Sequence, residues 1–203
     1  MALAVQELCD RARALADQRG GRVLIAIVGA PGAGKSTLAE TFVEALAPRA
    51  GLVPMDGFHY SQRMLNHLDR AKRKGAPDTF DAEGLAALLT RVRDASGPVF
   101  APTFDRSIEE PIAAGTVVPE RADIVIVEGN YLLLDDGAWS SVSAQFDEAW
   151  YLRIPHETRL GRLLARHMKH GRSEAAAREW VMRVDEANAK LIEATADRAD
   201  LIL

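Results

Sequence analysis

Apolar residues form five short runs along the chain, and amphipathic stretches separate most of these runs. The apolar runs cover residues 23–28, 50–55, 123–128, 147–153 and 199–203. In the stretches between them, apolar side chains recur at steps of three and four residues, which predicts helices. The predicted helices cover residues 34–47, 81–94, 156–169 and 173–195. Apolar strands that alternate with helices are typical of a parallel sheet covered on both faces, so we predict an α/β fold with a five-stranded parallel sheet flanked by helices.

Two further segments add to this pattern. Near the N-terminus, Val5, Leu8, Ala12 and Leu15 follow helical steps, which predicts a packing helix rather than a signal peptide. Residues 98–118 contain two short extended pieces, PVFAPTFD and GTVVPE. These pieces break the alternation of strand and helix, so we expect an extra short β-element beside the main sheet.

Composition narrows the class of partner. The chain has 203 residues without an internal repeat or a linker, so we expect one domain over residues 1–203. A net charge of −4 at pH 7 argues against a nucleic-acid binder. The lone Cys9 allows no intrachain disulfide, and no apolar run reaches the roughly 18 residues of a membrane span. We therefore expect a cytoplasmic protein without membrane insertion that acts on a small molecule.

The strongest chemical signal is the segment GAPGAGKS at residues 29–36, which satisfies G-x-x-x-x-G-K-[ST]. Its glycines let backbone N–H groups turn toward an anion, and the following helix adds its positive end. Lys35 is expected to reach the terminal phosphates of a nucleoside triphosphate, and Ser36 to hold Mg²⁺. An apolar strand before the segment and a good helix after it favour this interpretation over a glycine-rich turn without a ligand. The expected nucleotide contacts are Gly29, Ala30, Pro31, Gly32, Ala33, Gly34, Lys35, Ser36 and Thr37.

Several classes of nucleotide protein are excluded by missing motifs. The chain has no N-K-x-D, which a GTPase needs to read guanine, and no S-G-G of a transporter ATPase signature. Asp81 to Gly84 match D-x-x-G, but they open a helical stretch and follow no strand, so we treat the match as chance. What remains is a compact enzyme that encloses a nucleotide and a small substrate.

Two carboxylates stand at predicted strand ends, where open parallel sheets place their ligands. Asp56, in MDGFHY, is suited to accept the proton of an attacking hydroxyl, although an Asp at this place is also a common helix N-cap. Glu128 ends the run IVIVE and is suited to hold Mg²⁺ together with Ser36, although a glutamate there can also be a solvated strand end. The phosphate loop in the same sheet favours the catalytic interpretation of both.

A cationic stripe follows the fourth predicted strand, residues 147–153. Four cations on the predicted helix fall within an arc of about 80°, and they are Arg159, Arg162, Arg166 and Lys169. Positive charge stabilises the phosphates in phosphoryl transfer. The helix breaks at Gly171, as a lid loop would, so we expect a lid at about residues 159–178. The alternative is a solvated amphipathic face.

Two other features have less specific interpretations. The basic run with Arg70, Lys72, Arg73 and Lys74 is typical of a solvated loop, or it guides an anionic substrate. Trp180 stands at helical spacing with Val184, which favours a place in the core over a ligand contact.

These motifs together resemble a known family, the P-loop small-molecule kinases that include uridine kinase, phosphoribulokinase and bacterial pantothenate kinase. The resemblance covers nearly the whole chain from residue 23. It rests on GAPGAGKST, the DGF at 56–58, PDTFD at 77–81, PTFD at 102–105 and VEGNYLLL at 127–134. Within the family, MDGFH, FDRSIEEP and VEGNYLLL look most similar to proteins called fructose-transport-system kinases.

The resemblance implies roles for particular residues. In that family the Asp of the D-[GS]-F motif is the catalytic base, which falls on Asp56, and Arg-rich lids supply the equivalents of Arg162 and Arg166. Lys35 completes the expected catalytic set. The acceptor is expected to contact Asp56, Phe58, His59, Asp105 and Arg106.

The acceptor itself is left open by charges of both signs. Uridine kinases usually carry P-x-Y-D-F followed by a histidine, whereas this chain has FDRSIEE at 104–110. Paired carboxylates fit the hydroxyls of a free sugar or polyol. A cationic Arg106 fits a carboxylate or a phosphate equally well.

We therefore expect an ATP- and Mg²⁺-dependent kinase that phosphorylates a hydroxyl of a small metabolite, with a fructose-like sugar favoured. A nucleoside kinase is the first alternative, with an aromatic pocket from Phe58, Tyr60, Phe80 and Phe104. A pantothenate-type kinase and an ATP-binding regulatory protein of a sugar transport system are the others. The oligomeric state is open, a homodimer included.

Overall fold

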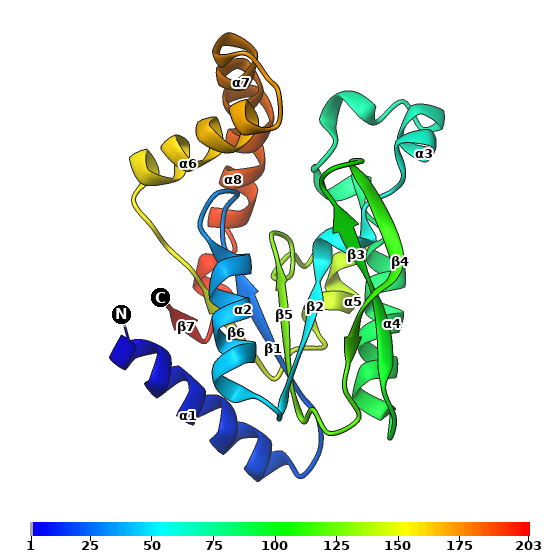
Figure 1. The fold of residues 1–203 in the computed structure, drawn as a ribbon, viewed down its shortest axis with the longest axis vertical. Coiled ribbons are helices and arrows are strands. Elements are labelled where there is room, and N and C mark those ends of the chain that lie inside the picture. Colours follow the sequence, from blue (N-terminus) through cyan, green and yellow to red (C-terminus); the bar gives the residue numbers. More distant parts are fainter. Residues whose placement is uncertain (1) are drawn as a thin grey trace.

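The computed structural model describes residues 2–203, with side chains from Val5 onward, and its centre is a five-stranded sheet (Figure 1). The strands lie in the order β2-β5-β1-β6-β7, and each neighbouring pair is parallel. Their bounds are β1 Val23–Val28, β2 Ala50–Pro54, β5 Ile124–Gly129, β6 Glu148–Tyr151 and β7 Leu201–Ile202. The predicted α/β fold with a five-stranded parallel sheet is confirmed.

The strands are apolar throughout because both faces of the sheet are covered. In β1, Leu24, Ala26 and Val28 pack into one hydrophobic cluster, and the alternating residues Val23, Ile25 and Ile27 pack into a second. The first cluster lies against α4 (Ala82–Asp94), α5 (Trp139–Ser143) and α8 (Glu186–Glu193). The second lies against α1 (Ala2–Arg19) and α2 (Lys35–Leu46). The predicted N-terminal packing helix is thus α1.

The C-terminal helical stretch is less regular than the sequence predicts. After α6 (His156–Lys169), the predicted helix at 173–195 consists of α7 (Glu174–Trp180), a π-helical turn (Val181–Asp185) and α8. The short α3 (Gln62–His67) and α5 were not predicted. In Figure 1, α6 and α7 stand above the carboxyl end of the sheet.

The extra β-element is a separate antiparallel hairpin of β3 (Val99–Asp105) and β4 (Glu110–Val118). It approaches the end of β2 so closely that a Cβ at Gly57 would lie 2.3 Å from the carbonyl oxygen of Pro102. A glycine is therefore needed here for the hairpin to pack against the turn that follows β2. This packing sets the tip of the hairpin beside Asp56.

Buried Arg22 fixes the opposite, amino end of the sheet. Its guanidinium donates hydrogen bonds to the backbone carbonyls of Val92, Gly97, Pro119, Glu120 and Ala122 at distances of 2.9–3.1 Å. One side chain thereby joins the ends of α4 and β4 to the start of β1. No local sequence pattern indicates this role.

Across the described residues 2–203, no helix is long and apolar enough to cross a membrane.

Candidate functional site

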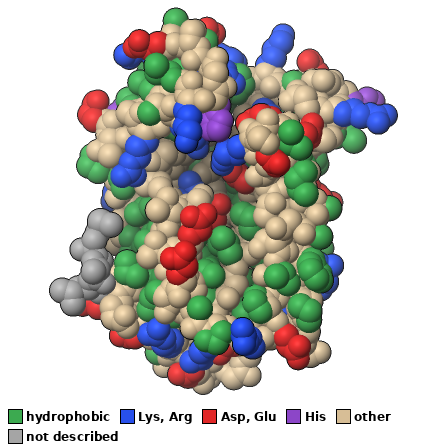
Figure 2. Space-filling view, in the orientation of Figure 1, with side chains coloured by type: hydrophobic (Ala, Val, Ile, Leu, Met, Phe, Trp, Pro, Cys, Tyr) green, Lys and Arg blue, Asp and Glu red, His purple; other side chains and the backbone are tan. Residues whose placement is uncertain are grey.

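A cavity of about 530 Å³ lies at the carboxyl end of the sheet, below α6 and α7. Figure 2 shows Lys, Arg and His side chains gathered around this hollow. The cavity brings together nine predicted site residues from distant segments of the chain, among them Lys35, Ser36, Asp56, Arg106, Glu128 and Arg166. His59, Pro31 and Gly32 also line it.

The loop at residues 29–36 connects β1 to α2 and packs against α6. Gly32 and Gly34 adopt φ values of +82° and +102°, a conformation that other residues rarely take. A Cβ at Gly32 would lie 2.9 Å from Cγ of Leu163 and 3.0 Å from the carbonyl oxygen of Arg159. The loop therefore depends on its glycines both for its turn and for its contact with α6.

Lys35 and Glu128 face each other at the base of the cavity, and both are buried. Burial lowers the pKa of the Lys35 ammonium to about 8, although the charge of Glu128 opposes that shift. Burial likewise raises the pKa of the Glu128 carboxyl to about 7; Asp56 adds to the shift, whereas Lys35 and a hydrogen bond from Ser36 reduce it. Burial thus disfavours the charged form of both groups, and a charged ligand would relieve this desolvation.

Asp56 lies in the turn Met55–Phe58 directly after β2. Its carboxylate accepts a hydrogen bond of 2.8 Å from Nη2 of Arg106, which follows β3. Burial raises the pKa of the Asp56 carboxyl, but the surrounding positive charges outweigh this effect and lower that pKa. Asp56 does not cap the next helix, because Ser61 caps α3. Asp56 is therefore an ionised carboxylate that faces the cavity.

The predicted cationic stripe is divided between different environments. Arg166 lines the cavity, as expected. Arg162 instead donates a hydrogen bond of 3.0 Å to the carbonyl oxygen of Ala33. Arg159 is buried and forms an ion pair with Glu186, so the prediction that it belongs to a phosphate-facing stripe is wrong. Lys169 is exposed near the end of α6.

Three other predicted contacts do not line the cavity. The carboxylate of Asp105 accepts hydrogen bonds from the backbone N–H and the hydroxyl of Ser107, which stabilise the turn of the hairpin. Phe58 packs in the hydrophobic core. Thr37 is exposed on the first turn of α2. These three residues belong to correctly located motifs, but their side chains point elsewhere.

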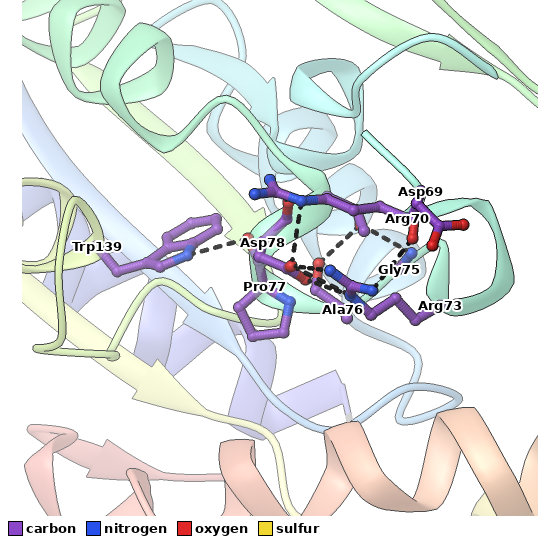
Figure 3. A network of polar contacts seen from close by, with 9 residues as sticks. Asp69, Arg70, Arg73, Gly75, Ala76, Pro77, Asp78 and Trp139 are labelled. Carbon is purple, nitrogen blue, oxygen red and sulfur yellow. Dashed lines mark hydrogen bonds and ion pairs between the residues drawn. The ribbon is translucent and has the colours of Figure 1, made fainter. Parts of the chain in front are cut away.

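The basic run forms a structured loop (Figure 3). Arg73 and Arg70 both form ion pairs with Asp78, at 2.7 and 3.4 Å. Lys74 differs from them, since it lines the cavity and its ammonium lies 5.1 Å from the ring centroid of Phe104. The run is therefore neither wholly solvated nor wholly directed at the substrate: one lysine of the run lines the cavity, and two arginines hold the loop.

The wall opposite Asp56 comes from the irregular C-terminal helix, and sequence reasoning missed most of it. Trp180 lines the cavity, so its expected place in the core is wrong. Asp185, in the π-helical turn, forms an ion pair of 2.8 Å with His167. Asn188 donates a hydrogen bond of 3.2 Å to the carbonyl oxygen of Gly75. A π-turn has no clear sequence signature, although these buried polar positions on an apolar helix were a possible signal.

A second cavity of about 310 Å³ lies on the other side of the phosphate loop. Ala30 and Ala33 of the loop form one wall, and Tyr151, Leu152 and Arg153 at the end of β6 form another. Ile154, Arg159 and Glu193 complete its lining, so the loop separates two cavities that both contain charged side chains.

Comparison with known proteins agrees with this geometry. Residues 24–203 match the sequence model of the phosphoribulokinase / uridine kinase family. The chain is 35% identical over 196 residues to a Schizosaccharomyces pombe protein named "Putative uridine kinase", with 90% of this chain and 83% of that protein covered. It is 32% identical over 134 residues to a Mycolicibacterium vanbaalenii pantothenate kinase, with 64% of this chain and 43% of that protein covered.

Among solved structures, the chain resembles one described as a "putative fructose transport system kinase" from Silicibacter sp. The two share 38% sequence identity with a TM-score of 0.90, and 98% of each chain is covered.

Proposed function

Because the chain belongs to the phosphoribulokinase and uridine kinase family, we propose that it is an ATP- and Mg²⁺-dependent kinase that phosphorylates a hydroxyl of a small, fructose-like sugar. The enzyme class, an ATP-dependent phosphotransferase of the small-molecule kinase type, follows from the family. The observation that carries the residue roles is that one cavity contains both the phosphate-loop lysine, Lys35, and the carboxylate of Asp56. The resemblance to a protein named for fructose transport supports the sugar.

ATP is expected to lie across the phosphate loop. Backbone N–H groups of the loop and the ammonium of Lys35 hold the phosphates. The second cavity, which shares Ala30 and Ala33 with the loop, receives the nucleoside. The phosphates then end in the charged cavity, where the acceptor binds.

Ser36 and Glu128 fit a magnesium ion. Mg²⁺ prefers oxygen ligands and keeps several of its waters, so one hydroxyl and one carboxylate suffice from the protein. The raised pKa of Glu128 reflects a buried carboxyl that lacks adequate compensation. A bound cation supplies that compensation, and it also neutralises charge on the phosphates.

Asp56 acts as the base in the proposed transfer. The acceptor oxygen forms a bond to the γ-phosphorus, the bond from that phosphorus to the bridging oxygen breaks to leave ADP, and the hydroxyl proton passes to Asp56. Arg166 faces the phosphates from the cavity wall. Arg162, which contacts the loop through Ala33, holds the loop in place and is close enough to turn toward the phosphates.

We further propose that residues 159–178 form a lid on a single domain and that the protein acts in the cytoplasm, where ATP is available. The segment lies above the cavity, and Arg166 and Arg172 from it line the cavity wall. Closure excludes water, so that transfer to the acceptor outruns hydrolysis.

The test is Asp56→Asn, measured by ADP release in the presence of acceptor and by calorimetric binding of Mg²⁺-ATP. We expect turnover to fall by at least about 100-fold because general-base catalysis is lost, and nucleotide affinity to stay within about twofold because Asp56 does not belong to the phosphate loop. Retained turnover would exclude Asp56 as the base. A wild-type protein that binds ATP but never releases ADP faster with any acceptor would favour the regulatory alternative.

A further inference from the structure

Two cations, Lys74 and Arg106, lie near each other in the wall of the charged cavity. Lys74 comes from the structured loop after α3, and Arg106 comes from the turn that follows β3. Their charged groups lie 5.1 and 5.9 Å from the ring centroid of Phe104. Phe104 is therefore a shared support that holds both cations at the cavity wall.

Both cations keep hydrogen-bond donors available for a ligand. The Arg106 guanidinium has five N–H donors, and among the described residues it makes one hydrogen bond, to Asp56 at 2.8 Å. The Lys74 ammonium donates to the carbonyl oxygen of Glu109 at 2.7 Å and lies 3.5 Å from the carboxylate of the same residue, which leaves further N–H donors of the ammonium. The side chain of Arg106 is 45% exposed and that of Lys74 is 14% exposed. Arg106 can thus hold Asp56 with one nitrogen and offer other nitrogens to the acceptor.

The carboxylates that line the cavity do not outnumber its cations. The carboxylates that line the cavity are Asp56, Glu109, Glu128 and Asp185, against Lys35, Lys74, Arg106, Arg166 and Arg172. Asp185 is already paired with His167, and Glu128 faces Lys35 and Ser36. Glu109 pairs with Lys74 and Asp56 with Arg106, so each of the four carboxylates has a cationic or histidine partner. The five lining cations outnumber the four carboxylates, and both Lys74 and Arg106 keep further N–H donors that an anionic group can use.

The aromatic rings of the cavity are occupied by protein groups. The ring of Phe80 lies 3.9 Å from that of His59, measured between centroids. Trp180 has the guanidinium of Arg172 at 4.0 Å and that of Arg183 at 5.3 Å from its ring. Phe104 has Lys74 and Arg106 beside its ring. Among the described residues, each Phe or Trp ring that lines the cavity therefore already contacts a cation or another ring, which disfavours stacking of a nucleobase.

We propose that the acceptor carries an acid group, a carboxylate or a phosphate monoester, which Arg106 and Lys74 bind beside Asp56. This inference rests on the proposed kinase function and names its acceptor class: a hydroxylated acid or a sugar phosphate rather than a free sugar or a nucleoside. A sugar-like acceptor is retained, but in its acidic form.

The ion pair between Arg106 and Asp56 also limits the size of the acceptor. The reacting hydroxyl contacts Asp56 and the acid group contacts Arg106, and each hydrogen bond spans roughly 2.8 Å. The distance between Arg106 and Asp56 adds a further 2.8 Å. Together with the width of the guanidinium, these distances limit the separation between the reacting hydroxyl oxygen and the acid oxygen of the acceptor to about 8–10 Å. Acceptors of about three to six carbons meet this limit.

The first experiment compares acceptors in matched sets: glycerol, glycerate and glycerol 3-phosphate, and fructose, gluconate and fructose 6-phosphate. The rate of ADP release is measured for the full chain with Mg²⁺-ATP. We expect an acid member of a set to exceed its neutral member in kcat/KM by at least about 10-fold, because a hydrogen bond to a charged group is lost with the neutral member. The carboxylate and phosphate members distinguish the two sources of negative charge. Neutral members that react equally well or better would overturn the inference.

The second experiment changes the cations. Arg106→Gln and Lys74→Gln should each raise KM for the acid acceptor by roughly 10- to 100-fold and leave the affinity for Mg²⁺-ATP unchanged. Lys72→Gln is the matched control, because Lys72 lies in the same basic run, is exposed and does not line the cavity. Arg106→Lys keeps the charge and should restore part of the loss. If Arg106→Gln instead lowers kcat equally for acid and neutral acceptors, Arg106 only positions Asp56 and the inference fails.

The two proposals fail in different ways. If no acceptor of any kind raises ADP release, the kinase proposal fails, and calorimetric titration of glycerol 3-phosphate and glycerate into the protein with Mg²⁺-ADP then decides on the acid site. Binding that Arg106→Gln abolishes would support the site, and absence of binding by both probes would overturn it. If neutral acceptors react and acids do not, the kinase proposal stands and the acid site is wrong.

Discussion

At the scale of single residues, the cavity holds charged groups whose pKa values are shifted by burial. Lys35 and Glu128 lie deep enough that burial lowers the pKa of the one to about 8 and raises that of the other to about 7. Asp56 differs from Glu128 because Arg106 and the other cations around it outweigh the effect of burial. Two carboxylates in one cavity thus have opposite pKa shifts: Asp56 favours its ionised form, which can accept a proton, whereas Glu128 favours its ionised form only with positive charge close by.

The lone Cys9 gives a test of burial at this scale. Its side chain is fully buried in the cluster between α1, α2 and the sheet, and burial raises the pKa of the thiol. Because the thiolate is the reactive form, we expect the native protein to react with a disulfide reagent at pH 8 at least about 100-fold more slowly than the unfolded chain. Absorbance of the released thiolate, with and without denaturant, measures both rates. Equal rates would mean that α1 does not pack against α2 and the sheet in solution.

At the scale of elements, the phosphate loop and α6 depend on each other. Gly32 lies against Leu163 and Arg159 of α6, and Arg162 donates a hydrogen bond to the loop. Any ligand that moves the loop is therefore coupled to the helix that begins the lid. Arg159, which the stripe suggested for phosphate binding, instead ties α6 to α8 through Glu186.

Substitution of Gly32 tests this coupling. Gly32→Ala places a Cβ 2.9 Å from Leu163 on a residue with φ of +82°, so α6 or the loop must shift. We expect a loss of roughly 1–3 kcal/mol in the free energy of unfolding and at least a tenfold weaker Mg²⁺-ATP affinity, measured by denaturant titration and calorimetry. Gly97→Ala is the control, since a Cβ at Gly97 meets no atom within 4 Å. Unchanged ATP affinity in Gly32→Ala would show that the loop tolerates displacement from α6.

At the scale of the whole molecule, stability and chemistry lie at opposite ends of the sheet. The carboxyl ends of the strands carry the cavity, whereas Arg22 joins the chain segments at the amino ends through its hydrogen bonds to carbonyl groups. The binding site therefore contains uncompensated charge while the far end is tightly hydrogen-bonded. Substitutions at the two ends should separate activity from stability.

Arg22→Met tests that separation. It leaves several buried carbonyl groups without their donor, so we expect a loss of roughly 3–5 kcal/mol in the free energy of unfolding. The kcat of the protein that remains folded should be within about twofold of the wild type, because Arg22 is remote from the cavity. Thermal unfolding and activity at a low temperature measure the two effects, and Arg121→Met is an exposed neighbouring control. A large loss of kcat at full folding would contradict the separation.

The sequence by itself determined the sheet, most of the helices and the location of the motifs, because these depend on local patterns. Apolar runs such as residues 23–28 must be buried on both sides, and the glycines around Lys35 carry their function in the backbone. It placed Asp56 and Glu128 at strand ends, and Lys35 where the phosphate loop leads into a helix.

Only the tertiary structure decided which side chains meet. Arg159 has the helical spacing of a cation that faces the cavity, yet it is buried and paired with Glu186. Trp180 has the spacing of a core residue, yet it lines the cavity next to a π-helical turn. The encounter of Lys74, Phe104 and Arg106 joins a loop to a hairpin tip about 30 residues away in the chain. Such contacts depend on how whole elements pack, which periodicity within one element cannot specify.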